Sequence, residues 1–408
     1  MLKDIIPRDP NFIAMAIGLA LLLGWGAGLL CRKIKVPMVV GYLVMGIILG
    51  QSLLGVFNNK NIPGLYIFTY IGLACIGFDI GGELAFHKMR NLGKPIIWIS
   101  VLETVAASAL VTIAIYLYTR KLYIALIFGA LASATAPAAT VDVLREYQAS
   151  GPLTTTTFAV VGIDDAYAVM IYAFASFLAK VLISNKDVHV AEAILRPIGE
   201  ILAALGIGLV IGLIFLFLTR NYTAKRGLLV LTWGVILATT GLANWLHLSL
   251  ILANMALGLT IVNLTRWKRE DVFELLRSTT PPLFVIFFVL VGAQLQAGKL
   301  VSLGMIGLLY IVFRTAGKMS GAYLGGIISD APQGVRKYLG LCLFSQAGVA
   351  IGLSIQTMIT FGGGKYGSAG TELGVMAISV IAATSLFFQI IGPPSTRIAV
   401  IKAGEANI

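Results

Sequence analysis

The stretch FAVVGIDDAYAVM, residues 158–170, places two adjacent carboxylates inside a long apolar segment. No other charged residue occurs between Glu146 and Lys180. Asp164 lies about eleven residues, or about 16 Å, from the expected start of this helix, near the centre of a bilayer. A charge at that depth costs at least a few kcal/mol, so Asp164 and Asp165 predict a functional site within a membrane helix.

The composition of the whole chain fits this interpretation. Its 408 residues are 58% hydrophobic and only 12% charged, and the mean hydropathy is +0.92. Soluble proteins carry about twice that share of charged residues. The apolar stretches are roughly 18–28 residues long and do not alternate as barrel strands do, so we expect an all-α polytopic membrane protein. The net charge of +12 indicates a basic cytoplasmic face rather than nucleic-acid binding.

Hydropathy and the breaks between apolar stretches predict thirteen transmembrane helices. Their expected ranges are 11–30, 38–54, 64–82, 95–118, 121–141, 153–179, 194–219, 226–246, 249–264, 279–297, 301–327, 338–360 and 370–392. With the N-terminus outside, the cytoplasmic segments carry 18 Lys and Arg residues and the outer segments carry 10. The excess predicts a multi-pass protein of the cell inner (plasma) membrane with its N-terminus outside and its C-terminus in the cytoplasm.

The two halves of the chain carry a weak internal repeat. LVMGI at 43–47 resembles MALGL at 255–259, and IGGEL at 80–84 resembles VGAQL at 291–295, with offsets of 212 and 211 residues. Chance matching between Gly- and Leu-rich helices is the alternative, and the constant offset argues against it. A shift of about 212 residues pairs each predicted span with the span seven places later in the chain. Because seven is odd, the two paired spans cross the membrane in opposite directions. We therefore expect two inverted six-helix repeats, the arrangement of many secondary transporters.

Two of the predicted spans contain residues that interrupt helices. SATAPAAT at 133–140 puts a proline and hydroxyl groups inside the membrane, and SQAGVAIG at 345–352 is small and polar at the equivalent place. Proline removes a helix hydrogen bond, and an ordinary kink would explain either stretch alone. Together they predict two discontinuous crossing helices at a midplane site. Ser133, Thr135 and Gln346 are the candidate site residues on these helices.

The eleventh span supplies two cations. Arg314 and Lys318 are four residues apart, so they share one face of the helix and need buried anions. Glu103 in the fourth span and the aspartate pair are the available ones. We expect Arg314 to form a structural ion pair with Glu103. Lys318 is the expected titrating cation, because lysine gives up its proton in a buried site more readily than arginine.

These motifs together resemble the monovalent cation/proton antiporter superfamily, in particular electrogenic bacterial sodium/proton antiporters of the NapA/NhaA type. VPMVVGYLVMGIILG at 36–50 resembles the family's first-repeat signature, and GIDDA at 162–166 resembles its Asp-Asp motif. Arg314 and Lys318 resemble the helix that faces this motif, and TAP at 135–137 resembles the unwound helix. The resemblance covers essentially the whole chain.

The resemblance implies an NhaA-like fold and a homodimer in the lipid bilayer. By repeat position, residues 1–92 and 223–298 would form dimerisation-domain helices 1–3 and 8–10. Residues 93–185 and 299–408 would form core-domain helices 4–6 and 11–13, and 186–222 would be the linking helix 7. The core would then hold every buried charge named above.

The resemblance also implies roles for the charged residues. Asp165 would bind the cation, Na⁺ or Li⁺, and Asp164 would pair with Lys318 and join the cation's ligands. Asp165 alone would exchange one proton for one cation, so electrogenic exchange needs a second proton carrier. That carrier would be Lys318, left unpaired when Asp164 turns to the cation, or Asp164 itself. The expected function is exchange of a monovalent cation for protons by alternating access.

Two departures from the family leave the ion's identity open. Ala136 stands where the electroneutral branch has an aspartate, and Val161 offers no oxygen where some relatives have serine. Backbone carbonyls, the hydroxyls of Ser133 or Thr135, or water would complete the coordination. A K⁺/H⁺ antiporter and a sodium-coupled organic-anion symporter of the same fold are the alternatives. We expect no enzyme activity, no cofactor and no nucleic-acid partner.

Overall fold

The computed structural model describes a chain of helices. The described residues are 10–33, 37–50, 53–57, 62–86, 93–184, 190–220, 225–264, 269–294, 304–364 and 366–406. The chain divides into two compact units. Unit 1 comprises Met1–Ala27, Tyr42–Asn91 and His189–Ala293, and unit 2 comprises Gly28–Gly41, Leu92–Val188 and Gln294–Ile408. The domain boundaries predicted at 92, 186, 222 and 298 fall on residues outside the described ranges.

Helices account for every regular element in the described ranges. Unit 1 holds all or most of α1 (Pro10–Lys33), α2 (Met38–Leu49), α3 (Ile62–Glu83), α9 (Val190–Thr219), α10 (Lys225–Trp245), α11 (Leu250–Leu264), α12 (Arg269–Thr279) and α13 (Pro281–Gln294). Unit 2 holds α5 (Lys94–Thr119), α6 (Leu122–Ser133), α7 (Pro137–Glu146), α8 (Pro152–Ser184), α15 (Gly304–Ile328), α16 (Gln333–Cys342), α17 (Gly348–Phe361) and α18 (Gly367–Ala403).

Each of the thirteen predicted ranges overlaps a helix or a broken pair of helices. Within the described residues, six helices are long and apolar enough to cross a membrane, and they lie at Ile13–Lys33, Pro95–Thr119, Pro152–Ser184, Ile198–Thr219, Gly227–Trp245 and Gly367–Ala403. A seventh candidate is the pair Asp271–Thr279 and Pro281–Gln294, which is bent by 52°. The chain is therefore all-α and polytopic.

One helix was not predicted from hydropathy. Helix α12 has the sequence REDVFELLRST, which lacks an apolar run long enough to signal a span. Its apolar residues instead recur at helical spacing, and Val272, Phe273 and Leu276 are buried in the core of unit 1. The Phe273 ring lies 4.9 Å from that of Phe78 on α3. An amphipathic pattern of this kind marks a helix that packs by one face.

Glycines bring the helices of unit 1 into backbone contact. A Cβ built on Gly81 of α3 would lie 2.0 Å from the carbonyl oxygen of Met255, and one on Gly258 of α11 would lie 2.2 Å from that of Phe78. Helices α2 and α13 meet in the same way, with Gly46 against Gly292. Close approach through small residues is a common means of helix association in membranes.

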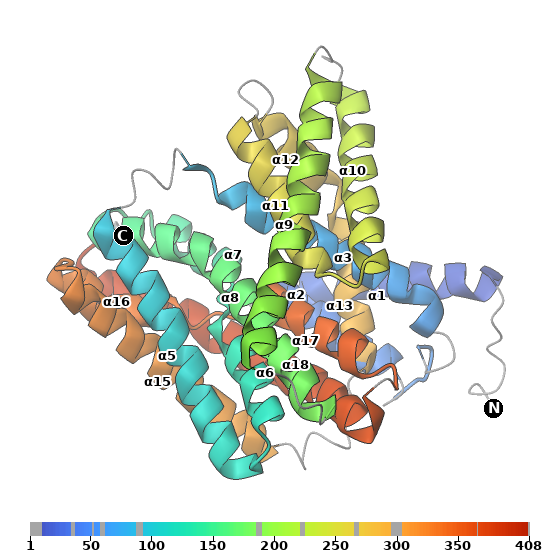
Figure 1. Cartoon of the computed structure of the whole chain (residues 1–408). Coiled ribbons are helices and arrows are strands. Elements are labelled where there is room, and N and C mark those ends of the chain that lie inside the picture. The colour runs from blue at the N-terminus through green and yellow to red at the C-terminus, as the bar shows by residue number, and fades with distance from the viewer. Residues whose placement is uncertain are drawn as a thin grey trace. The chain divides into compact units, whose positions relative to one another are not determined.

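Unit 2 is built around the long contact between α5 and α15, which lie side by side (Figure 1). Three glycines of α15 recur every fourth residue along this contact. A Cβ on Gly317, Gly321 or Gly325 would lie 2.4–2.6 Å from a Cα atom of α5. The two backbones therefore touch, and this contact fixes which residues of α5 stand opposite Lys318.

Candidate functional site

Two helices of unit 2 are interrupted, as the sequence predicts. Helix α6 ends at Ser133 and α7 begins at Pro137, with Ala134 and Ala136 in extended conformation between them. Helix α16 ends at Cys342 and α17 begins at Gly348. The two interruptions meet, because the Ala136 N–H donates to the Ser345 carbonyl at 2.8 Å. Main-chain carbonyls that would otherwise be used within a helix are thereby exposed to side chains.

Arg314 binds these carbonyls and forms no ion pair with a carboxylate of the described residues. Its guanidinium donates to the carbonyl oxygens of Ala132, Ala134 and Phe344 at 3.1, 2.8 and 2.9 Å. The side chain is fully buried, and its charged carbon lies 4.3 Å from the centre of the Phe388 ring. The predicted Arg314–Glu103 ion pair is therefore wrong: freed carbonyls satisfy the arginine, and Glu103 pairs elsewhere.

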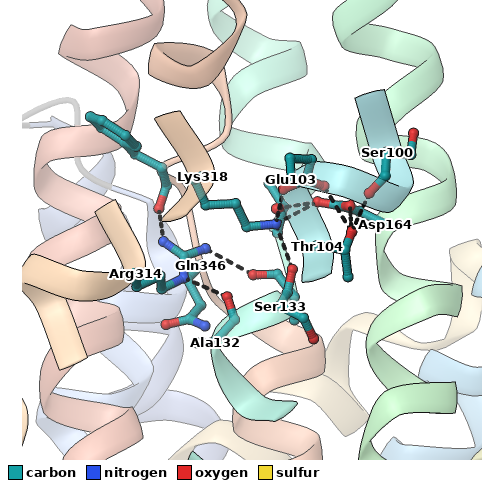
Figure 2. Close-up of polar contacts among 12 residues, drawn as sticks. Ser100, Glu103, Thr104, Ala132, Ser133, Asp164, Arg314, Lys318 and Gln346 are labelled. Atoms are coloured by element: carbon teal, nitrogen blue, oxygen red, sulfur yellow. Dashed lines mark hydrogen bonds and ion pairs between the residues drawn. The ribbon is translucent and has the colours of Figure 1, made fainter. Parts of the chain in front are cut away.

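Lys318 stands one turn along α15 and takes the carboxylates instead. Its ammonium lies 2.6 Å from Glu103 Oε2 and 2.9 Å from Asp164 Oδ2, and it donates to the Ser133 carbonyl at 2.5 Å (Figure 2). All three charged side chains are 0% exposed. The ammonium donates to Asp164 Oδ2 and to the Ser133 carbonyl, and its contact with Glu103 Oε2 is an ion pair without a hydrogen bond.

Two hydroxyl groups hold Asp164 from the other sides. Thr135, in the interruption between α6 and α7, donates to Asp164 Oδ2. Thr104 of α5 lies 2.9 Å from Asp164 Oδ1, 3.0 Å from Glu103 Oε1 and 2.6 Å from the Ser100 carbonyl. A hydroxyl carries one hydrogen, so Thr104 can donate to only one of these oxygens at a time. A contact with Glu103 or Asp164 becomes a further hydrogen bond when that carboxyl group carries a proton and donates it to the hydroxyl oxygen.

Asp165 is the next residue of α8 and is also buried, with 6% of its surface exposed. Successive helix residues point about 100° apart, so the two aspartates face different neighbours. Glu103, Asp164 and Asp165 thus put three buried carboxyl groups in unit 2, on α5 and α8. Oxygen atoms of this kind are what hard cations bind.

The network has an arginine end, around Arg314, and a lysine end, around Lys318. The other predicted residues divide between these two ends. The Ser133 hydroxyl donates to the Ala130 carbonyl at 2.5 Å, so Ser133 reaches Lys318 through its main chain only. Gln346 lies at the arginine end, where its amide donates to the Leu131 carbonyl at 3.0 Å and to the Tyr310 hydroxyl at 2.8 Å. Among the predicted hydroxyls, that of Thr135 is the one bonded to an aspartate.

Thr104 was missed by the sequence reasoning. Its position directly after the buried Glu103 was the available signal, because a hydroxyl beside an intramembrane carboxylate has few other partners. Its bond to the Ser100 carbonyl, four residues back, is the common arrangement for threonine in a helix and would not have marked it out.

Comparison with known proteins finds a family model and several relatives for the whole chain. The sequence model described as "Sodium/hydrogen exchanger, transmembrane" matches residues 17–402. The Na⁺/H⁺ antiporter NhaS4 of Synechocystis is 26% identical over 337 residues, covering 76% of this chain and 80% of that protein. A Na⁺/H⁺ antiporter of Enterococcus hirae is 24% identical over 329 residues, covering 78% and 83%. The ammonium/H⁺ antiporter subunit AmhT of Alkalihalophilus pseudofirmus is 25% identical, covering 76% and 77%.

A solved structure shares the fold. The sodium proton antiporter MjNhaP1 from Methanocaldococcus jannaschii, determined at pH 8, superposes with a TM-score of 0.76 at 19% sequence identity. The match covers 96% of this chain and 99% of that one.

Proposed function

We propose, because the chain belongs to the transmembrane sodium/hydrogen exchanger family, that it exchanges Na⁺ or Li⁺ for protons, with Asp165 and Asp164 as the cation's carboxylate ligands. Membership makes the chain a multi-pass membrane transporter and not an enzyme, and its general activity is monovalent cation/proton antiport. The choice of cation, the residues that bind it and the charge moved per cycle are the parts proposed here.

The observation that carries the proposal is the burial of three carboxyl groups in unit 2, one of which, Asp164, is bonded to Thr135 in the interrupted helix. Glu103, Asp164 and Asp165 are 0, 0 and 6% exposed. A cation loses its hydration shell on entering such a site, and ionised oxygens can compensate for that loss. Thr135 and the extended main chain beside it offer neutral oxygens for the remaining ligands. The same carboxylate oxygens bind protons, so cation and proton compete for one site.

The cycle follows from this competition. With Asp165 ionised, the cation binds from one side of the membrane, and unit 2 then exposes the site to the other side. Release of the cation leaves Asp165 open to a proton, and the protonated site returns. One cation has then been exchanged for one proton at Asp165, without net charge movement.

A second proton makes the exchange electrogenic, and the Glu103–Asp164–Lys318 cluster supplies its carrier. When Asp164 turns toward the cation, Lys318 still has Glu103 at 2.6 Å and the Ser133 carbonyl. The lysine is therefore not left unpaired, and the proton belongs to the coupled cluster rather than to one residue. Thr104, with one hydrogen between two carboxyl groups, favours a proton shared there.

Inverted repeats give the cycle its two conformations. An offset of 211–212 residues relates Gly46 to Gly258 and Gly81 to Gly292. The close contact of Gly46 with Gly292 therefore has its counterpart in the contact of α3 and α11 at Gly81 and Gly258. This correspondence supports two six-helix repeats of opposite orientation and thirteen crossings of the membrane.

The two units have different roles in the proposed transporter. Unit 2 is the moving core, because it contains all the charged residues of the site. Unit 1, with its glycine contacts and apolar core, is the dimerisation domain of a homodimer. The excess of Lys and Arg in the expected cytoplasmic segments supports an N-terminus outside and a C-terminus in the cytoplasm, in a protein of the inner membrane.

Proton flux in proteoliposomes tests the choice of ion. Vesicles with a preset pH gradient receive Na⁺, Li⁺, K⁺ or an organic anion, and an internal dye reports the change in pH. We expect dissipation by Na⁺ and Li⁺. A response to K⁺ alone would identify a K⁺/H⁺ antiporter, and a response to the organic anion would identify a symporter of the same fold.

The reversal potential tests electrogenicity. Vesicles are clamped at set membrane potentials under known Na⁺ and H⁺ gradients, and the condition of zero net flux is located. If the numbers of protons and cations exchanged per cycle are unequal, the gradients at which net flux is zero change with the membrane voltage. A condition that stays at equal gradients regardless of voltage means 1:1 exchange and excludes a second proton.

A further inference from the structure

The chain end beyond α18 docks onto the helix that carries the two aspartates. Glu405 directly follows Gly404, which has a left-handed backbone conformation and ends α18. Only 8% of the surface of Glu405 is exposed. Its carboxylate accepts the N–H of Leu153 at 2.7 Å, the N–H of Thr154 at 2.8 Å and the Thr154 hydroxyl at 2.8 Å. These groups are the first free donors of α8, because Pro152 has no N–H.

Local sequence makes room for this contact. Gly151 has φ of +152°, and a Cβ there would lie 2.4 Å from the carboxyl carbon of Glu405. Any other residue at 151 would push the carboxylate away. Helix α8 has no acidic residue in its own first turn, so Glu405 supplies the negative charge that a helix N-terminus favours.

The same end of α18 holds the turn between α7 and α8 at two further points. The Ser150 N–H donates to the Glu405 main-chain carbonyl at 3.0 Å, and the Arg397 guanidinium lies 5.4 Å from the centre of the Tyr147 ring. A surface charge that only improved solubility would not be buried, bonded three times and backed by two neighbouring contacts. The whole arrangement ties α18 to the α7–α8 turn.

We propose that Glu405 is a positioning residue of the antiport site. Helix α7 begins directly after the interruption that carries Thr135, and α8 carries Asp164 about 18 Å from its start at ~1.5 Å per residue. By fixing the turn that joins these helices, Glu405 sets the distance between the Thr135 hydroxyl and the Asp164 carboxylate. The inference deepens the proposed function and rests on it for the transport measurement.

Two variants remove the contact by different means. Glu405→Gln keeps the shape but turns one acceptor into a donor facing N–H groups, and Gly151→Ala keeps the charge but blocks its approach. Glu372→Gln is the matched control, because Glu372 also lies in unit 2, is 54% exposed and pairs only weakly with Lys121 at 3.7 Å. Amide hydrogen exchange at Leu153 and Thr154 is measured together with the KM and maximal rate for Na⁺.

We expect faster amide exchange in both variants and a rise in the Na⁺ KM of roughly tenfold, in line with the cost of small displacements in a binding site. The control Glu372→Gln should match the wild type in amide exchange and in the Na⁺ KM. Faster amide exchange with an unchanged KM would overturn the positioning role, and so would unchanged amide exchange. Should Glu405→Gln fail to fold, Gly151→Ala and Glu405→Asp decide the question.

Failure of the proposed function is distinguishable from failure of this inference. If the wild-type protein moves none of the tested cations, amide exchange in α8 around Asp164 replaces the KM as the measurement. Faster exchange there in both variants supports positioning by Glu405. Wild-type exchange around Asp164, with Leu153 and Thr154 already released, contradicts it.

Discussion

Arg314 and Lys318 lie one turn apart on α15 and both are fully buried, yet their surroundings differ in kind. Arg314 is bonded to three main-chain carbonyls, whereas Lys318 is held by two carboxylates and one carbonyl. Carbonyl oxygens cannot take up a proton or exchange partners without moving the backbone. Carboxylates can take a proton or a metal cation in place. The arginine end therefore belongs to the architecture, and the lysine end, with Glu103 and Asp164, is where the chemistry is possible.

The largest effect is expected from Asp165→Asn, which asks whether buried carboxylates rather than carbonyls carry the chemistry. The amide keeps the size of the side chain but not the charge that compensates cation dehydration, so we expect complete loss of transport and of ion binding in a folded protein. Counterflow of labelled Na⁺ in proteoliposomes is the measurement. Asp142→Asn, on the exposed face of α7, is the matched control. Wild-type exchange by folded Asp165→Asn would exclude Asp165 as the ligand of the transported cation.

Arg314→Gln should damage the fold rather than the chemistry. It leaves three buried carbonyls of the two interruptions without their donor, and we expect a loss of ~3–5 kcal/mol in the free energy of unfolding, since each unsatisfied buried acceptor costs about 1–3 kcal/mol. Lys318→Gln should cost less, because Glu103 and Asp164 can take up protons once the ammonium is gone. Denaturation in detergent compares the two, with Arg336→Gln as a partly exposed control. Equal losses for both variants would contradict the division into two ends.

The pH dependence of cation binding should arise at the carboxylate end. Protonation and cation binding use the same oxygens, so the apparent Na⁺ affinity should be weaker at about pH 6 than at about pH 8.5. The sign follows because lower pH fills the site with protons. Flux measured over a range of Na⁺ concentrations at each pH gives the two affinities. Equal affinities at both values would rule out simple competition.

The smallest expected effect is that of Thr104→Val. The change removes one hydroxyl between Glu103 and Asp164, worth ~1 kcal/mol for a typical hydrogen bond, so we expect less than a tenfold change in cation affinity. Thr112→Val is the control, because Thr112 lies on the same helix and bonds only to the Ser108 carbonyl. A large effect of Thr112→Val would mean that loss of any α5 hydroxyl disturbs the helix.

Much of the architecture could be predicted because its causes are local. Pro137 cannot continue the helix hydrogen bonding of α6, and Gly348 and the polar residues before it weaken a helix by their backbone freedom and competing hydrogen bonds, so both interruptions were predictable. Burial of Asp164 followed from the length of the apolar stretch around it. Helix α12 was missed because its apolar residues recur at intervals and form no continuous run.

The partners of the buried charges could not be predicted, because they depend on the register between helices. The sequence offered Glu103 to either Arg314 or Lys318. The choice is made by Gly321, which brings the α15 backbone against the Cα of Glu103 and so sets the ammonium beside that carboxylate. The contact of Glu405 with Thr154 spans 251 residues and has no local pattern at all.

The glycine contact between α5 and α15 also decides how the site can be reached. Where a methyl group on Gly317 or Gly321 would lie 2.4 Å from a Cα atom, a water molecule cannot pass either. That side of Lys318 is dry, and no hydrated ion can approach it between these two helices. Ions and protons must therefore reach Lys318 by a route other than the contact between these two helices. The absence of a few side chains along α15 thus closes one approach to the buried lysine.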